Sequence, residues 1–256
     1  MLVSRFRQNG LPVLAMAALL LGGSPASAAS LGLGVYVDGQ WVGYYGSSVL
    51  GCNDIPGTPT AVCAGTGPVE IGGSDGMAID SWNVFVDSDP IINGIIAVTN
   101  IGAITQQFTL IFTLPIAPAI PGGTVIGGSI QGGATDNNGN GVTLSTAGPG
   151  TAFYTARIDG ADVQSLYPDA QAFSTAAPFG SINVPALSFG APIPSQLGPA
   201  ALVNIGIRLD FLLTPGDSAS FTSNFVVQPV PLPPAMVLFG GALGLLGWFR
   251  RKSVAA

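Results

Sequence analysis

Residues 72–76 read Gly-Gly-Ser-Asp-Gly and so have the Gly-x-Ser-x-Gly spacing of a hydrolase nucleophile elbow. The serine of such an elbow attacks only after a neighbouring histidine takes its proton. The 256-residue chain contains no histidine. We therefore interpret this segment as a turn. The same absence, together with only two cysteines, excludes most catalytic triads and nearly every histidine-ligated or cysteine-clustered metal site.

Two carboxylates can cleave a glycosidic bond without histidine, one as an acid and the other as a base or nucleophile. Asp80, Asp87 and Asp89 form the densest acidic group of the chain. Asp87 and Asp89 share strand parity, but Asp89 precedes Pro90, which is typical of a strand end, so turn capping is the favoured interpretation. A glycan-cleaving enzyme that uses Asp80 and Asp87 is therefore the third of our functional hypotheses.

Residues 136–141, Asp-Asn-Asn-Gly-Asn-Gly, match the first six positions of a calcium-binding loop. The twelfth position, which should be a bidentate glutamate, is Ala147. We expect a hairpin turn in which the Asn and Gly residues accept positive φ angles. Asp136, Asn138 and Asn140 are kept only as a weak metal-site candidate, and otherwise the sequence predicts no metal and no cofactor.

Three aromatic rings could bind a sugar if Asp38 and Gly39 form a two-residue turn. Tyr36 would then pair with Trp41, and Tyr45 would share their face of the hairpin. The opposite, more aliphatic face is the better core candidate, and it carries Leu33, Val35, Val37, Val42 and Tyr44. The competing interpretation is that the rings cover strand glycines and pack under a neighbouring loop.

The elements that would position these residues are strands. The chain has 48% apolar residues, 37 Gly and 21 Pro, which favours short strands and turns. Apolar and polar residues alternate over 203–213 and 219–227, on either side of a Thr-Pro-Gly-Asp turn, and predict a β-hairpin with one buried face. Residues 107–114 alternate in the same way. Further strands are expected at 33–37, 40–45, 79–86, 92–99, 124–130, 142–146 and 152–158.

About ten short strands predict an all-β fold, a single antiparallel β-sandwich domain that is jelly-roll-like and spans residues 29–228. We interpret the Pro/Ala/Ser-rich stretch 176–199 as a long connection, with a split into two subdomains as the weaker alternative. Between residues 29 and 228 the chain has 2 basic and 13 acidic residues, a net charge of 2 − 13 = −11. A body this acidic repels phosphate backbones, so we expect no nucleic-acid partner.

The two ends of the chain read as targeting segments. Arg5 and Arg7 precede an apolar run over 11–21 and an Ala-Ser-Ala sequence at 26–28, which together predict a signal peptide of residues 1–28 that signal peptidase removes. In an exported protein, Cys52 and Cys63 are expected to form a disulfide worth roughly 3 kcal/mol. A reactive thiol or a two-cysteine metal site is the alternative for this pair.

The C-terminal segment 229–256 has three parts. The Pro-rich motif comprises Val230, Pro231, Leu232, Pro233 and Pro234, a charge-free apolar run over 235–249 follows, and Arg250, Arg251 and Lys252 come next. By the positive-inside rule the basic end stays in the cytoplasm and the acidic body lies outside. We expect the apolar run to form a short C-terminal transmembrane helix.

This order of parts resembles the PEP-CTERM sorting signal in its Val-Pro-Leu-Pro variant. The resemblance implies processing by an exosortase, a membrane-embedded enzyme of Gram-negative bacteria that make exopolysaccharide. We therefore expect a non-enzymatic exported protein, first a membrane-anchored intermediate and then at the cell surface or in the extracellular matrix, associated with exopolysaccharide. The second hypothesis is a carbohydrate-binding module that uses Tyr36, Trp41 and Tyr45.

Overall fold

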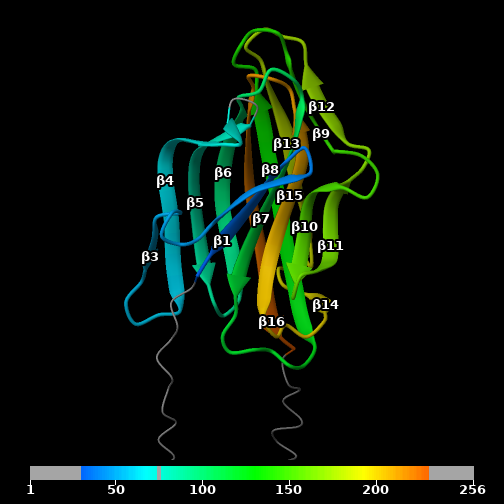
Figure 1. The fold of residues 1–256 in the computed structure, drawn as a ribbon. Helices are drawn as coiled ribbons and strands as arrows, with labels where there is room; N and C mark the ends of the chain where they lie inside the picture. The colour runs from blue at the N-terminus through cyan, green and yellow to red at the C-terminus, as the bar shows by residue number, and fades with distance from the viewer. Residues whose placement is uncertain (1–29, 74–75, 231–256) are drawn as a thin grey trace, which may run out of the picture.

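The computed structural model describes residues 30–73 and 76–230. All regular secondary structure in this part is β, and sixteen strands form two antiparallel sheets that pack face to face (Figure 1). No helix that could cross a membrane occurs in the described part. The predicted signal peptide, the predicted transmembrane helix and the sorting residues from Pro231 onward lie outside the described residues.

Sheet A has the strand order β11-β10-β15-β7-β1-β2, and β9 pairs with both β15 and β12. Its strands are β1 (Gly32–Val37), β2 (Gln40–Tyr45), β7 (Gln106–Pro115), β9 (Val142–Ser145), β10 (Ala152–Ile158), β11 (Ala161–Pro168), β12 (Ala172–Thr175) and β15 (Asn204–Leu213).

Sheet B has the order β13-β8-β16-β6-β5-β4-β3, and β14 also pairs with β8. Its strands are β3 (Cys52–Asp54), β4 (Thr60–Ile71), β5 (Met77–Asp87), β6 (Ile91–Asn100), β8 (Thr124–Thr135), β13 (Ser181–Phe189), β14 (Gln196–Gly198) and β16 (Ser218–Pro229). The prediction of an all-β fold with two antiparallel sheets, as in a β-sandwich, is confirmed.

The core lies between the sheets and draws on most of their strands, and the alternating residues of β15 and β16 are part of it. The inward residues of β15 are almost fully buried, as are most of those of β16. The predicted hairpin between these two runs is wrong, because β15 pairs with β7 and β10 in sheet A, whereas β16 pairs with β6 and β8 in sheet B. Their apolar faces meet across the core instead, with ring centroids of Phe211 and Phe221 4.9 Å apart.

The stretch 176–199, predicted to be a connection, contains β13 and β14. Of the nine residues of β13, only Val184 and Phe189 are buried, so the strand has no alternating apolar pattern to read from the sequence. Pro185 also sits where the register with β8 shifts. Proline at an irregularity of a terminal strand costs no interior ladder hydrogen bond.

The disulfide between Cys52 and Cys63 is confirmed. The two residues face each other as register partners on β3 and β4. The link thus ties the terminal strand of sheet B to its neighbour.

Candidate functional site

The β1–β2 hairpin carries the aromatic candidates. Asp38 and Gly39 form its turn with φ angles of 48° and 75°, the pair of positive values that a two-residue type I′ turn requires. Tyr36 and Trp41 are register partners, as predicted. Their ring centroids are 5.0 Å apart in an edge-to-face arrangement.

A β-bulge changes the rest of the predicted ring set. Val35 pairs with Gly43 while Tyr36 pairs with Trp41, so β2 carries one extra residue, Val42. Beyond this bulge the side-chain parity reverses. Tyr45 pairs with Leu33 and packs against the core, whereas Tyr44 is turned outward.

The outer rings are therefore Tyr36, Trp41 and Tyr44, and the assignment of Tyr45 to this face is corrected. Trp41 is 54% exposed and Tyr44 61%. Both rings also lie on β1 glycines. A Cβ built on Gly34 would be 3.1 Å from Cζ3 of Trp41, and one built on Gly32 would be 1.9 Å from the hydroxyl of Tyr44. The alternative is thus right in that the rings cover strand glycines, but the exposure of Trp41 and Tyr44 shows that these two rings do not pack under a neighbouring loop.

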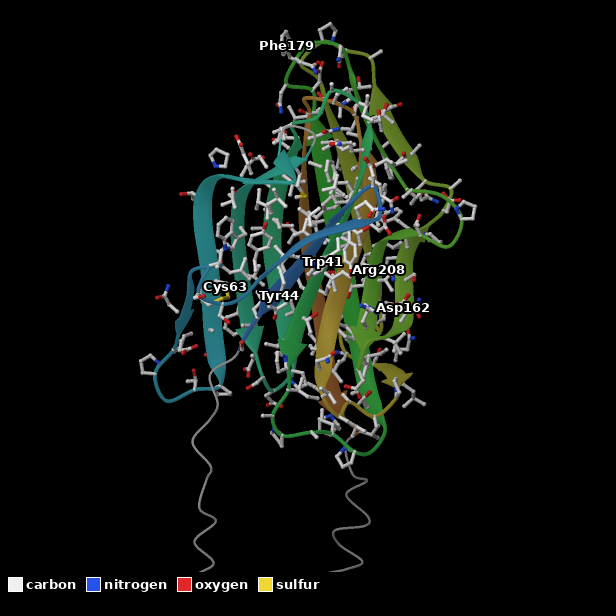
Figure 2. The ribbon with its side chains drawn as sticks, in the orientation of Figure 1. Trp41, Tyr44, Cys63, Asp162, Phe179 and Arg208 are labelled. Carbon is white, nitrogen blue, oxygen red and sulfur yellow. A yellow bond between two sulfur atoms is a disulfide. The ribbon has the colours of Figure 1, made fainter. Side chains whose placement is uncertain are left out.

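Polar side chains continue this outer face of sheet A on the neighbouring strands. By register, Tyr36 on β1 is followed by Thr109 on β7 and Asp210 on β15. The next row contains Gly34, Ile111 and Arg208. Figure 2 shows Trp41 and Tyr44 on the same side of the molecule as Arg208 and Asp162.

One carboxylate joins the two cations of this face. Asp162 on β11 accepts from Nε of Arg157 at 2.9 Å and from Nη2 of Arg208 at 3.0 Å. Arg157 and Arg208 are also the only basic residues between positions 29 and 228. The body thus places both of its cations on the same face as the exposed rings.

Arg208 and Asp210 leave hydrogen-bonding capacity at the base of this face. Nε of Arg208 is buried and has no hydrogen-bond partner among the described residues. Burial raises the pKa of Asp210, although a hydrogen bond from Gln107 at 2.9 Å and the charge of Arg208 oppose the rise.

The carboxylates of the third hypothesis do not meet. Asp80 and Asp87 are separated by seven positions on β5, or about 23 Å at ~3.3 Å per residue, whereas a glycosidase pair needs about 5–9.5 Å. Asp80 accepts from the Thr99 hydroxyl at 2.7 Å. Asp87 accepts from the backbone N–H of Asp89 at 2.9 Å, which confirms the predicted turn capping.

The Asp136 loop is organised around its own backbone. The carboxylate accepts four N–H groups at 2.8–3.1 Å, from Asn138, Gly139, Gly141 and Phe179. Burial raises the pKa of Asp136, but these four donors outweigh it and lower the pKa to about 2. The side chain of Asn138 is likewise engaged, with the N–H of Asn140 and the carbonyl of Pro215. Oxygens occupied in this way do not form a preformed cation site.

Among the described residues, no cluster of three or more acidic or cysteine side chains could hold a metal ion. Ser74 and Asp75 of the Gly-x-Ser-x-Gly segment lie outside the described residues. The sequence reasoning missed Tyr44, Arg157, Asp162, Arg208 and Asp210. The signal that could have found the arginines is their rarity. Two basic residues in a body of thirteen acidic ones are candidates for a specific role.

No protein-family model matches this chain, and a comparison with curated proteins finds no significant match. Exposed rings and fixed hydrogen-bonding groups on one face suit a ligand that has both apolar surfaces and hydroxyls.

Proposed function

We propose that this chain is a non-catalytic exported protein of the cell surface or matrix of a Gram-negative bacterium, and that its body binds polysaccharide through the outer face of sheet A. A signal peptide (residues 1–28) delivers it, and an exosortase processes the tail that begins near Val230. The delivery and processing rest on the sequence of the two ends. The binding rests on the exposure of Trp41 and Tyr44 on the same outer face of sheet A as the Arg157–Asp162–Arg208 cluster.

A sugar ring has apolar C–H faces that stack on aromatic rings and hydroxyls that exchange hydrogen bonds with arginine and carboxylate groups. The face offers both, on a sheet that is six strands wide from β2 to β11. Five interstrand spacings of ~4.8 Å make this width about 24 Å. An extended chain of several sugars fits such a surface better than a single small molecule does, because the face is open and not a closed pocket.

The charges favour a neutral polysaccharide. The polar cluster contains two cations, Arg157 and Arg208, and two carboxylates, Asp162 and Asp210, so its formal charge is 2 − 2 = 0. The body as a whole carries −11, which repels polyanions at distances within the Debye length. Uronic-acid polymers and nucleic acids are therefore poor ligands for this surface.

Affinity electrophoresis tests the proposal. The protein is run through gels that contain the producer's own exopolysaccharide, a neutral glucan or alginate. We expect retardation by a neutral polymer and about a tenfold weaker interaction for Trp41→Ala or Tyr44→Ala, equivalent to ~1.4 kcal/mol. Phe179→Ala is the matched control, because Phe179 is an aromatic residue that is at least as exposed, at 69%, but lies at another part of the molecule.

Two results would overturn the proposal. If neither the neutral polymers nor the exopolysaccharide retards the protein, the body does not bind glycans through this face. If new reducing ends appear in the exopolysaccharide after incubation with pure protein, the chain is an enzyme and the non-catalytic assignment is wrong.

A further inference from the structure

Two loops and the last described residue form one surface at the end of the sandwich where β16 finishes. The loops are 116–123, which precedes β8, and 190–203, which surrounds β14. Neither loop contains a charged residue. Figure 1 shows β14, the start of β8 and the end of β16 at the same end of the molecule. We call this surface, together with Val230, the apolar end.

Backbone hydrogen bonds hold the parts of the apolar end together. The N–H of Val230 donates to the carbonyl of Gly123 at 3.2 Å, and the N–H of Ile116 donates to the carbonyl of Val203 at 3.0 Å. Ile120 and Ala201 form an isolated antiparallel bridge between the two loops. The surface is therefore built into the fold and is not a set of unrelated loop tips.

Large apolar side chains project from this surface into solvent. Leu197 is 76% exposed, Val203 62%, Leu202 52%, Val230 42% and Ile193 38%. These five make up more than a third of the thirteen large exposed apolar residues in the described part. Single exposed apolar residues are ordinary, but a cluster of them marks an interaction surface.

The carboxylate of Asp159, an exposed residue in the turn between β10 and β11, is bonded to the backbone of the second loop. Asp159 accepts the backbone N–H groups of Leu202, Val203 and Asn204 at 2.7–3.0 Å. Burial raises the pKa of Asp159, but these three donors outweigh it and lower the pKa. The carboxylates of Asp87 and Asp89 border the surface through the β5–β6 turn, where the carbonyl of Pro90 accepts from Val227.

The sequence that follows Val230 indicates what the apolar end would face. Only four residues, all within the Pro-rich motif, separate Val230 from the apolar run 235–249. Five Cα–Cα steps span at most about 18 Å at ~3.3–3.6 Å per residue. While the apolar run is inserted in a bilayer, the apolar end is thus the part of the body that lies nearest to the lipid.

We propose that the apolar end lies against the lipid surface in the anchored intermediate. In this orientation the strands run away from the membrane, and the outer face of sheet A is exposed to solvent and not to lipid. This inference rests on the proposed export and membrane insertion of the tail. Leu and Val side chains gain by entering the headgroup boundary, and the absence of charged residues in both loops lowers the cost of doing so, although Asp87, Asp89 and Asp159 border the surface.

The test uses full-length protein reconstituted into phosphatidylcholine vesicles. Ser195→Cys places a fluorescent probe in the apolar end without removing an apolar side chain, and Asn140→Cys places the same probe in the loop that follows β8. The eleven residue steps along β8 separate these two ends by about 36 Å. The native cysteines form a disulfide and do not react with the probe.

We expect spin-labelled lipids to quench the Ser195 probe several-fold more strongly than the Asn140 probe. The double variant Leu197→Glu, Leu202→Glu should abolish this difference while the protein still floats with the vesicles. Equal quenching of both probes in protein that floats would overturn the proposed orientation. The apolar end would then be a surface for a protein partner and not for lipid. Failure to float would instead refute the anchored state, and with it the proposed sorting.

Discussion

Gly65 and Trp82 are paired across β4 and β5, and the indole ring occupies the space that a side chain at position 65 would need. A Cβ built on Gly65 would be 2.1 Å from Cζ2 of Trp82. The ring cannot swing away, because Trp82 is 9% exposed and its Nε1 donates to the carbonyl of Leu50 at 2.8 Å. This glycine therefore gives the Trp82 ring the space it needs against β4 and against the segment between β2 and β3 that contains Leu50.

Gly65→Ala should lower the free energy of unfolding by about 1–3 kcal/mol, the usual cost of overpacking a core. Gly32→Ala is the control, because its Cβ would also meet a ring, that of Tyr44, but this ring is 61% exposed and free to move. We expect a change below about 0.5 kcal/mol there. Urea unfolding measures both, and equal losses would show that Trp82 adapts as easily as Tyr44.

Asp136 predicts a defined acid dependence of stability. Its pKa is about 2 in the folded protein and about 3.9 when unfolded. A lowered carboxylate pKa stabilises the fold above the unfolded pKa, and this contribution is lost as the pH falls from about 4 through 2. The wild type should lose stability over this window, whereas Asp136→Asn should start less stable and show a flatter profile.

Thermal unfolding between pH 5 and about pH 2 measures this difference, and parallel profiles would contradict it. Burial and the charge of Asp136 raise the pKa of the neighbouring Asp217, so an Asp217→Asn variant serves as the control with the opposite sign.

Millimolar calcium should leave the Tm of wild type unchanged, because the oxygens of Asp136 already accept backbone N–H groups.

Asp162→Asn should change which polysaccharide the outer face prefers. The substitution leaves Arg157 and Arg208 without their shared carboxylate and turns a neutral cluster into a cationic one. We expect weak, salt-sensitive retardation by alginate to appear in affinity electrophoresis. Because Asp162 is 44% exposed, the stability cost should stay within about 1 kcal/mol. Unchanged discrimination would show that these arginines do not face the ligand.

The C-terminal motif predicts the mass of the mature protein. Protein recovered from a host with an intact exosortase should lack residues beyond roughly Pro234, because a proline-rich backbone is extended and lacks amide donors, which suits a protease cleft. Replacement of Pro231 and Pro233 by Ala should make an uncleaved, membrane-retained form accumulate. Intact mass spectrometry decides, and a mature chain that still ends at Ala256 would make the tail an ordinary membrane anchor.

The sequence was informative wherever one local rule decided the structure. The Asp38-Gly39 turn and strands β2 and β10 occur within the predicted residues, because the turn chemistry and the period of two are local. The bulge at Val42 was not predictable, because the sequence of β2 shows no sign of a register shift. The shift exchanges the faces that were predicted for Tyr44 and Tyr45.

Longer-range features were missed for a different reason. Alternation over 203–213 and 219–227 shows that each run buries one face, but it does not tell whether the two runs pair or face each other across a core. The cluster of Arg157, Asp162 and Arg208 depends on the pairing of β10 with both β11 and β15. That pairing is decided by the packing of the whole sandwich.

The placement of the two arginines also bears on the resistance of the body to proteolysis. Proteases that cut after basic residues find only Arg157 and Arg208 between positions 29 and 228. Both lie inside strands whose backbone is hydrogen-bonded to neighbours on either side, and not at the loop tips where cleavage usually begins. A body that has no lysine, and whose two arginines lie in hydrogen-bonded strands, should resist trypsin-like proteases.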